Sequence, residues 1–304
     1  AANGSGHRRG PLPYRVAALW SGLQKCFLVG GMLVGLEAFL AEYDWGVPLY
    51  RQVWQPLMLA AFAAFAFTAA RAWAGRGGAL GTWAVYAVVR SLATLIPVIA
   101  GRSPASVPLL LVAALCVELV ALRVAARSRP LVFGAIAGLS VGTLGMAAEY
   151  AWSQLVMPLP WTSGLIAEGL PTAALAGIAG GVIGALLASA LHAELPPKRV
   201  ARGAFVGAFA LFVALCVNAG LREIPDVTAQ FELTEVSAEP ERSAQMTVRL
   251  QPADAISEDA SWLYVLAWQG GPGAQRVVDR LERVGDGVYR TTEPIPLYGS
   301  WKSG

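Results

Sequence analysis

Long apolar runs dominate the first 221 residues of the chain. A helix that crosses the hydrocarbon core of a bilayer needs about 20 consecutive apolar residues. Seven segments meet or approach that length, at residues 16–41, 53–73, 79–100, 106–122, 131–152, 163–191 and 203–221. The fourth is at the short limit, and the sixth is long enough to begin with a tilted or re-entrant stretch near Pro171. The pattern predicts a membrane all-α bundle of seven transmembrane helices over residues 16–222.

The pattern changes to short alternating runs after Leu221. Apolar and polar residues alternate through 231–236 and 246–250, and further strands are predicted at 262–268, 276–284 and 288–291. Glycine-containing turns at 270–273 and 285–287 separate the last three strands. Short strands at spacings of about ten residues are typical of antiparallel sandwiches. Residues 225–304 are therefore expected to form a small antiparallel β-sandwich.

The loops between the predicted helices differ sharply in charge. Only 14% of the residues are charged and 56% are hydrophobic, which excludes an ordinary soluble protein. One set of loops carries eleven basic residues and the alternate set carries three, so the positive-inside rule places the first set in the cytoplasm. We therefore expect a multi-pass protein of the cell membrane with residues 1–15 cytoplasmic and the β domain extracytoplasmic. The first set is Arg8, Arg9, Arg15, Arg71, Arg76, Arg123, Arg127, Arg129, Lys198, Arg199 and Arg202, and the second is Arg51, Arg102 and Arg222.

The charge balance and the metal-binding residue types restrict the partners and cofactors. The chain has a net charge of +8 up to Glu223 and −5 from Pro225 onward, which sum to the overall +3. Topology and anionic lipid account for the basic loops, so the bilayer is the expected partner and nucleic acid is not. His7 and His192 are the only histidines, which argues against haem and multi-histidine copper sites but leaves a metal ion possible. The three cysteines lie in apolar runs without a CxxC neighbour and are interpreted as small buried hydrophobes.

Ionisable residues inside the predicted spans are the candidate functional residues, because a charge in hydrocarbon is costly unless it is paired or hydrated. Glu37, Glu149 and Glu168 all map toward the outer ends of their spans, and we call them the outer carboxylates. Arg90 lies near the middle of the third span, and Glu118 lies toward the cytoplasmic end of the fourth. These five are candidates for ion pairing or transport. Two further acids, Glu42 and Asp44, follow just outside the first span.

Three interpretations of the outer carboxylates stay open from the sequence. They could be neutralised by Arg90, Arg51 or Arg102. They could instead form a cation-entry or metal site together with the thioether of Met146 or Met157, since carboxylates suit hard ions and thioethers suit Cu(I). Glu37, Glu149, Glu168 and Met157 are the candidate metal ligands in that case. The third interpretation is a proton relay, or acids hydrated at the interface.

The end of the chain resembles a known class of domain. Gly287 and Tyr289 form a G-x-Y strand, and Gly299 with Trp301 forms a G-x-W element after a proline-containing stretch. This arrangement resembles the extracytoplasmic immunoglobulin-like domains of the FixH and YtkA families, over about residues 225–304. The resemblance implies an interaction domain, in families often associated with copper or oxidase assembly. The tail departs from a copper-binding version because it has no His or Cys and its only methionine is Met246. The final strand expected after Trp301 is also missing. We therefore expect either an incomplete domain or an edge that a partner supplies.

The sequence supports a non-enzymatic function more than a catalytic one. Walker A, GxGxxG, HExxH and GxSxG motifs are absent. Small residues at four-residue spacing in the fifth and sixth spans predict close helix packing, within one bundle or between copies. We expect a subunit or assembly factor of a membrane complex that acts through its outer β domain. The alternatives are a transporter or ion-conducting protein that uses the outer carboxylates, and a metal-dependent membrane enzyme. The chain does not begin with Met, and its first residues do not form a signal peptide, which is compatible with a piece of a longer product.

Overall fold

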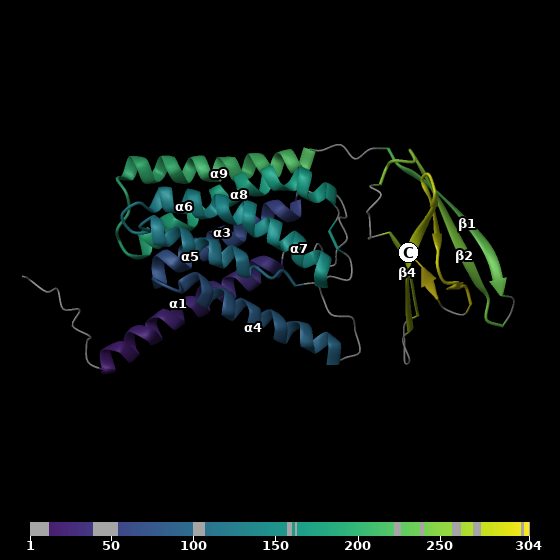
Figure 1. Ribbon diagram of the computed structural model, residues 1–304, viewed down its shortest axis with the longest axis horizontal. Helices are drawn as coiled ribbons and strands as arrows, with labels where there is room; N and C mark the ends of the chain where they lie inside the picture. Colours follow the sequence, from purple (N-terminus) through teal and green to yellow (C-terminus); the bar gives the residue numbers. More distant parts are fainter. Residues whose placement is uncertain are drawn as a thin grey trace, which may run out of the picture.

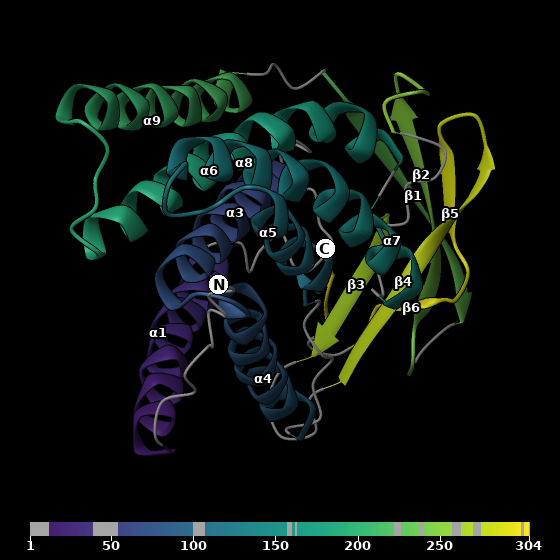
Figure 2. The same ribbon diagram turned by 60° about the vertical axis from the view of Figure 1, so that its left-hand side comes forward.

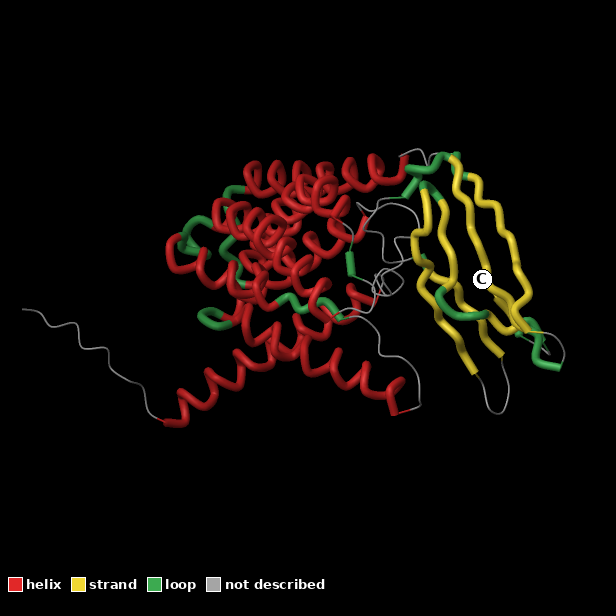
Figure 3. The backbone as a smooth tube through the Cα atoms, turned by 45° about the vertical axis from the view of Figure 1, so that its right-hand side comes forward, coloured by secondary structure: helices red, strands yellow, loops and turns green. Residues whose placement is uncertain are grey.

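The computed structural model contains a helical bundle followed by a β-sheet (Figure 1). The bundle and the sheet occupy separate parts of the chain, as Figure 3 shows by colour. Several segments, including the one between α7 and α8 that contains Met157, lie outside the described residues. The structure describes residues 12–38, 54–99, 107–156, 160–161, 163–221, 226–237, 240–256, 263–269, 275–298 and 301–303.

Each of the seven predicted spans corresponds to helical structure. The helices are α1 (Leu12–Ala38), α3 (Trp54–Ala74), α4 (Gly78–Ile99), α5 (Leu111–Arg123), α6 (Pro130–Ser140), α7 (Met146–Val156), α8 (Ser163–Leu191) and α9 (Lys198–Leu221). A π-helical turn, η1 (Val141–Gly145), joins α6 to α7 without a break, so Pro130–Val156 is one span. The helix α8 also runs continuously through Pro171.

The count of seven full-length spans is not confirmed. Within the described part of the chain, six helical segments are long and apolar enough to cross a bilayer. The exception is α5, which has 13 residues and is about 20 Å long. A hydrocarbon core is about 30 Å thick, so α5 reaches only part of the way across. Residues 107–110, which were predicted to be helical, are not.

The centre of the bundle is a close-packed group of α3, α6 and α8. In this group α8 makes its most extensive contacts, and glycines allow the backbones to approach (Figure 1). A Cβ atom at Gly134 would lie 2.5 Å from the carbonyl oxygen of Gly181, and one at Gly138 would overlap the carbonyl oxygen of Gly177. On a neighbouring side of α8, a Cβ at Gly180 would overlap the carbonyl oxygen of Ala61 in α3. The small-residue pattern therefore serves packing inside one bundle.

The outer members of the bundle are less buried than its centre. Figure 2 shows α1 and α4 splayed on one side and α9 on the other. None of the apolar window of α9 is buried, and only 17% of that of α4 is. Their exposed faces are rich in large apolar side chains, for example Leu92, Ile96 and Val206. Lipid contact explains these exposed apolar faces.

The turns after α3, α5 and α8 carry basic residues and lie at one end of the bundle. Lys25 donates to the carbonyl of Trp73 at 3.2 Å, which joins the first helix to the α3–α4 turn. Arg127, after α5, lies 3.4 Å from the ring of His192 in the α8–α9 turn. At the other end α9 finishes and the chain continues to the sheet (Figure 1). The turn between α3 and α4 is tight because Gly75 and Gly77 adopt φ of +92° and +78°.

The C-terminal part is one continuous antiparallel sheet in the order β1-β2-β5-β4-β3-β7, with β6 paired to β2. A second packed sheet, and with it the predicted sandwich, is not confirmed. Two small apolar clusters form on the curved sheet, one around Val248 and Tyr289 and the other around Val265 and Ile295, with Leu281 packed against both. The strands are β1 (Thr228–Ser237), β2 (Ser243–Gln251), β3 (Tyr264–Gln269), β4 (Gln275–Gly285), β5 (Val288–Thr291), β6 (Ile295–Pro296) and β7 (Lys302–Ser303).

A short strand does follow Trp301, contrary to the prediction. Residues 302–303 form β7 and pair with Ala267 and Trp268 of β3. Trp301 itself lies edge-on to Tyr298, with ring centroids 6.4 Å apart. The predicted turn at 270–273 and the side chain of Trp262 lie outside the described residues.

Candidate functional site

A non-helical segment inside the helical bundle is the most unusual local feature of the structure. Residues 107–110, which we call the entry segment, precede α5 and end at Leu110 in the left-handed region, with φ of 54°. Pro108 has no amide hydrogen to donate to a helix. The segment contacts Tyr86, the ninth residue of α4, which is about 12 Å from the start of that helix. Non-helical backbone at such depth is tolerated only where its polar groups are satisfied by protein or water.

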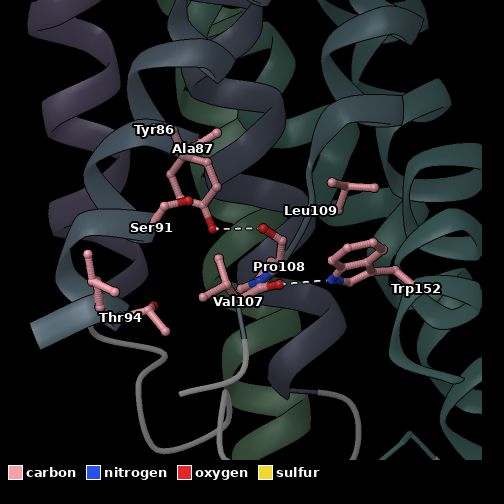
Figure 4. A pocket seen from close by; sticks show the side chains of 9 residues that line it. Tyr86, Ala87, Ser91, Thr94, Val107, Pro108, Leu109 and Trp152 are labelled. Carbon is pink, nitrogen blue, oxygen red and sulfur yellow. Dashed lines mark hydrogen bonds between the residues drawn. The ribbon is translucent and has the colours of Figure 1, made fainter. Parts of the chain in front are cut away.

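Three aromatic side chains satisfy the carbonyl groups of the entry segment. The indole of Trp83 donates to the carbonyl of Leu109 at 2.7 Å. Figure 4 shows the hydroxyl of Tyr86 donating to Pro108 at 3.1 Å and the indole of Trp152 donating to Val107 at 3.0 Å. The two tryptophans are therefore internal ties in the bundle. A buried aromatic ring with a polar handle suits this task because it packs and donates at once.

Glu149 satisfies the amide groups of the entry segment. Its two carboxylate oxygens accept hydrogen bonds from the amides of Leu109, at 2.8 Å, and Leu110, at 2.5 Å. The residue is only 2% exposed. These amides precede the first turn of α5, where free N–H groups and the helix dipole favour a negative charge. Glu149, which lies in α7, therefore holds the start of the partial-length helix α5.

A π-helical turn places Glu149 beside that helix. Its five residues, Val141–Gly145, precede α7, which carries Glu149. A π turn inserts an extra residue and rotates the next part of the helix about its axis, and such turns are frequent at functional sites. Gly145 is within the turn, and a Cβ there would lie 3.2 Å from the Cβ of Ala113 in α5. The bulged span can thus approach α5 closely.

A cavity lies against the entry segment on the side of α4. Its volume is about 430 Å³, and it is walled by α4, the entry segment and Trp152 (Figure 4). Ser91 and Thr94 contribute hydroxyl groups, while Leu95 and Val107 are apolar. The carbonyl groups of the entry segment are already bound to the three aromatic donors, so the walls offer few polar groups. The size falls within the range of small-molecule sites, and the lining suits an apolar guest.

Glu118 holds a second helix start in the same way. It accepts hydrogen bonds from the amides of Gly77, at 3.2 Å, and Ala79, at 2.9 Å, at the beginning of α4. It also forms an ion pair with Arg71 at 2.8 Å. Two of the five predicted candidates, Glu118 and Glu149, thus fix helix ends by binding backbone amides. Ion pairing was among the predictions for Glu118, and Arg71 is its partner in the structure.

The structure describes the side chains of two of the three outer carboxylates, Glu37 and Glu149. Glu37 is fully buried in α1. Since Gly30 lies against Val85, and α1 and α4 run in the same direction there, Glu37 falls at about the depth of Arg90. Glu37 and Arg90 both have interaction partners. The side chain of Glu168, like Met157, Glu42, Asp44, Arg51 and Arg102, lies outside the described residues.

The metal interpretation receives no geometric support from the residues that the structure places. Among them, no group of three or more His, Cys, Asp or Glu side chains is arranged to hold a metal ion. Met146 is 3% exposed and belongs to the apolar core of the bundle. The oxygens of Glu149 bind backbone amides.

The first strand of the sheet is an open edge. β1 pairs with β2 along its length and stands at the end of the strand order, with every residue exposed. Phe231 and Leu233 face the same side as their partners Val248 and Met246, because directly paired residues share a face. They are 67% and 54% exposed, whereas Val248 is 3% exposed. The apolar face of the sheet therefore continues uncovered onto its edge strand.

The aromatic ties and the hydrogen bonds of Glu149 were not anticipated from the sequence. The proximity of Pro104 and Pro108 was the available signal for an interruption of the fourth span. Searches for a matching family model, a similar curated protein and a similar solved structure found none.

Proposed function

We propose that this protein is a non-catalytic subunit or assembly factor of a membrane complex, and that it binds its partner at the β1 edge. The observation that carries the proposal is the ten-residue edge strand with Phe231 and Leu233 exposed in line with a buried apolar face. An exposed apolar edge is an aggregation hazard for a protein that stays alone. Covering it with a partner removes that hazard.

The occupant that fits the edge is an extended segment of another protein. The unpaired N–H and C=O groups of β1 can form ladder hydrogen bonds with such a segment. Apolar side chains at every second position of the partner would cover Phe231 and Leu233. The part of the chain from Pro225 onward carries a net charge of −5, so basic side chains beside the paired segment would complement it.

The membrane part supports a scaffold in this proposal. Glu118 and Glu149 bind backbone amides at two helix starts, and glycine-mediated contacts lock α8 between α3 and α6. These are features of a rigid support for the sheet. We place the sheet outside the cell and the basic loops in the cytoplasm, following the positive-inside rule. The FixH/YtkA resemblance of the C-terminal part agrees with an extracytoplasmic interaction domain.

Purification from native membranes tests the proposal. Wild-type protein in mild detergent is expected to carry a stoichiometric companion whose cross-links map to β1. Lysines at both apolar edge positions, Phe231→Lys with Leu233→Lys, are expected to release it. Val278→Lys is the matched control, because Val278 is 45% exposed on the interior strand β4. A companion retained by the double variant, or a wild-type monomer without companions, contradicts the proposal.

The cavity beside the entry segment favours one alternative, a transporter of a small apolar solute. Broken helices and non-helical backbone at membrane depth line the binding sites of many transporters. Liposome flux assays with Ala87→Phe, which adds a ring to the cavity wall, and with Glu149→Gln and Glu168→Gln address it. Flux that is present in wild type and lost with Ala87→Phe would favour transport over the scaffold.

A further inference from the structure

A second cavity lies between α8 and α9 at the end of the bundle where the basic loops gather. Its volume is about 480 Å³. Its walls are apolar, with Leu187 and Ala190 from α8, Ala201 and Phe205 from α9, and Phe65 from α3. Most of the α9 surface is exposed in the bundle, so the cavity is a lateral groove that lipid can reach.

One charged residue stands in the wall of this groove. Arg202 is exposed and lines the cavity in the first turns of α9. Lys198 and Arg199 are also exposed and begin the same helix. The N-terminal end of a helix adds a partial positive charge to these side chains. Glu194, in the turn before α9, is the acid nearest in sequence and leaves a net positive charge over residues 194–202.

We propose that this groove binds one anionic phospholipid, with an acyl chain between α8 and α9 and the phosphate at Arg202. An apolar trough that ends in basic side chains matches an acyl chain that ends in an anionic head group, as in the basic pockets that bind acidic lipids between transmembrane helices. The volume is suited to part of one chain. A whole helix, about 10 Å across, would not fit.

Charge distinguishes this occupant from other candidates. A zwitterionic lipid could place a chain in the groove but would gain less from Arg202. Free phosphate could meet the basic side chains but would gain nothing from Phe205 and Ala201. A second copy of the chain would bring the same positive charges to the interface, which disfavours it. The combination of chain and negative charge is what the groove selects.

Two variants separate the contributions of charge and of the groove. Arg202→Gln removes the positive charge and keeps a long side chain. Ala201→Phe adds a ring to the groove wall, and Ala190→Phe does so from α8 should the first variant fail to fold. Arg123→Gln is the control for charge, because Arg123 is an exposed basic residue at the end of α5 and is not part of the groove. Ala210→Phe is the control for the added ring, because Ala210 is exposed and, about two and a half turns further along α9, faces the side opposite Ala201.

Native mass spectrometry of the full chain, titrated with dioleoyl phosphatidylglycerol or dioleoyl phosphatidylcholine, measures the binding. Wild type is expected to bind one phosphatidylglycerol more tightly than phosphatidylcholine. Arg202→Gln should weaken phosphatidylglycerol binding about fivefold, since one basic side chain near anionic lipid has an effect of that order. Ala201→Phe should weaken both lipids, and the two controls should match wild type. Glycerophosphoglycerol, which lacks acyl chains, should not compete.

Several results would overturn the proposal. Equal affinity of wild type for the two lipids would remove the charge selectivity. Phosphatidylglycerol binding unchanged by both Arg202→Gln and Ala201→Phe would place the lipid elsewhere. Competition by glycerophosphoglycerol would make the site a phosphate site without a chain. These outcomes do not depend on whether β1 binds a partner, so the lipid site and the proposed function can fail separately.

Discussion

Replacing Glu149 by glutamine should release the entry segment from α7. The carboxylate now accepts one hydrogen bond from each of two amides. A glutamine side chain has one carbonyl oxygen, so one amide would face an NH₂ group that cannot accept. A hydrogen bond to a charged group contributes about 1.5–3 kcal/mol, and a buried donor left unsatisfied costs about 1–3 kcal/mol. These terms overlap, and we expect a loss of about 2–4 kcal/mol of local stability.

Hydrogen exchange measures this loss at the amides concerned. Because 1.4 kcal/mol is a factor of ten in an equilibrium constant, the opening of residues 109–110 should become about 30- to 700-fold more favourable. Exchange mass spectrometry on the full chain in detergent, with a peptide that covers the start of α5, reports this directly. Glu194→Gln is the control, because Glu194 is an exposed acid in the α8–α9 turn.

A milder variant keeps the test informative if Glu149→Gln unfolds the whole protein. Trp152→Phe removes one neutral hydrogen bond, to the carbonyl of Val107, and should raise opening about two- to tenfold. Glu149→Gln should therefore increase the opening of the entry segment more than Trp152→Phe does. Exchange in Glu149→Gln within threefold of wild type would refute the assignment of Glu149 as the residue that holds α5.

Three further substitutions test other contacts in the same chain. Glu118→Gln weakens the amide contacts at the start of α4 and the ion pair with Arg71, and should cost about 1–3 kcal/mol in detergent unfolding; an unchanged midpoint would contradict this. Gly138→Ala drives a methyl group into the α8 backbone and should lower the free energy of unfolding by about 1–3 kcal/mol or more. Its control is Gly207→Ala, whose methyl group meets open space and should be neutral or slightly stabilising. Equal unfolding midpoints for the two variants would rule out the close packing. Asp279→Ala removes the carboxylate that accepts hydrogen bonds from the amides of Thr292 and Glu293 and from the hydroxyl of Thr292, and should speed amide exchange there at least tenfold; protection equal to wild type would show that these bonds do not stabilise the turn.

The helices were predictable from the sequence wherever the length of an apolar run alone determined them. Residues 163–191 were predicted with the observed bounds of α8, because a long apolar run has no other stable state in a bilayer. The strand at 276–284 was likewise found within one residue as β4. The order in which the strands pair was harder to predict, because the residues of one strand do not specify which strand lies beside it. The continuous sheet was therefore not distinguishable from a sandwich.

The site was predictable only as a set of unusual residues. Glu118 and Glu149 stood out because acids are costly in apolar spans. Their roles depend on backbone amides about 40 residues away in sequence, and one-dimensional patterns carry no such information. A tryptophan near the end of an apolar span is most often an interfacial anchor, so the sequence gives no reason to expect hydrogen bonds from Trp83 and Trp152 to a chain segment inside the bundle. Their hydrogen bonds to the entry segment became visible only once the chain between α4 and α5 was placed.

Photo-cross-linking at β1 in native membranes tests whether a partner protein binds this edge. A benzoylphenylalanine at position 233 replaces a leucine that is 54% exposed on the open edge, and one at position 284 replaces a valine that is 46% exposed on β4. A single discrete protein adduct is expected from position 233 and none from position 284. Adducts of equal yield from both positions, or none from position 233, would contradict a partner at the β1 edge.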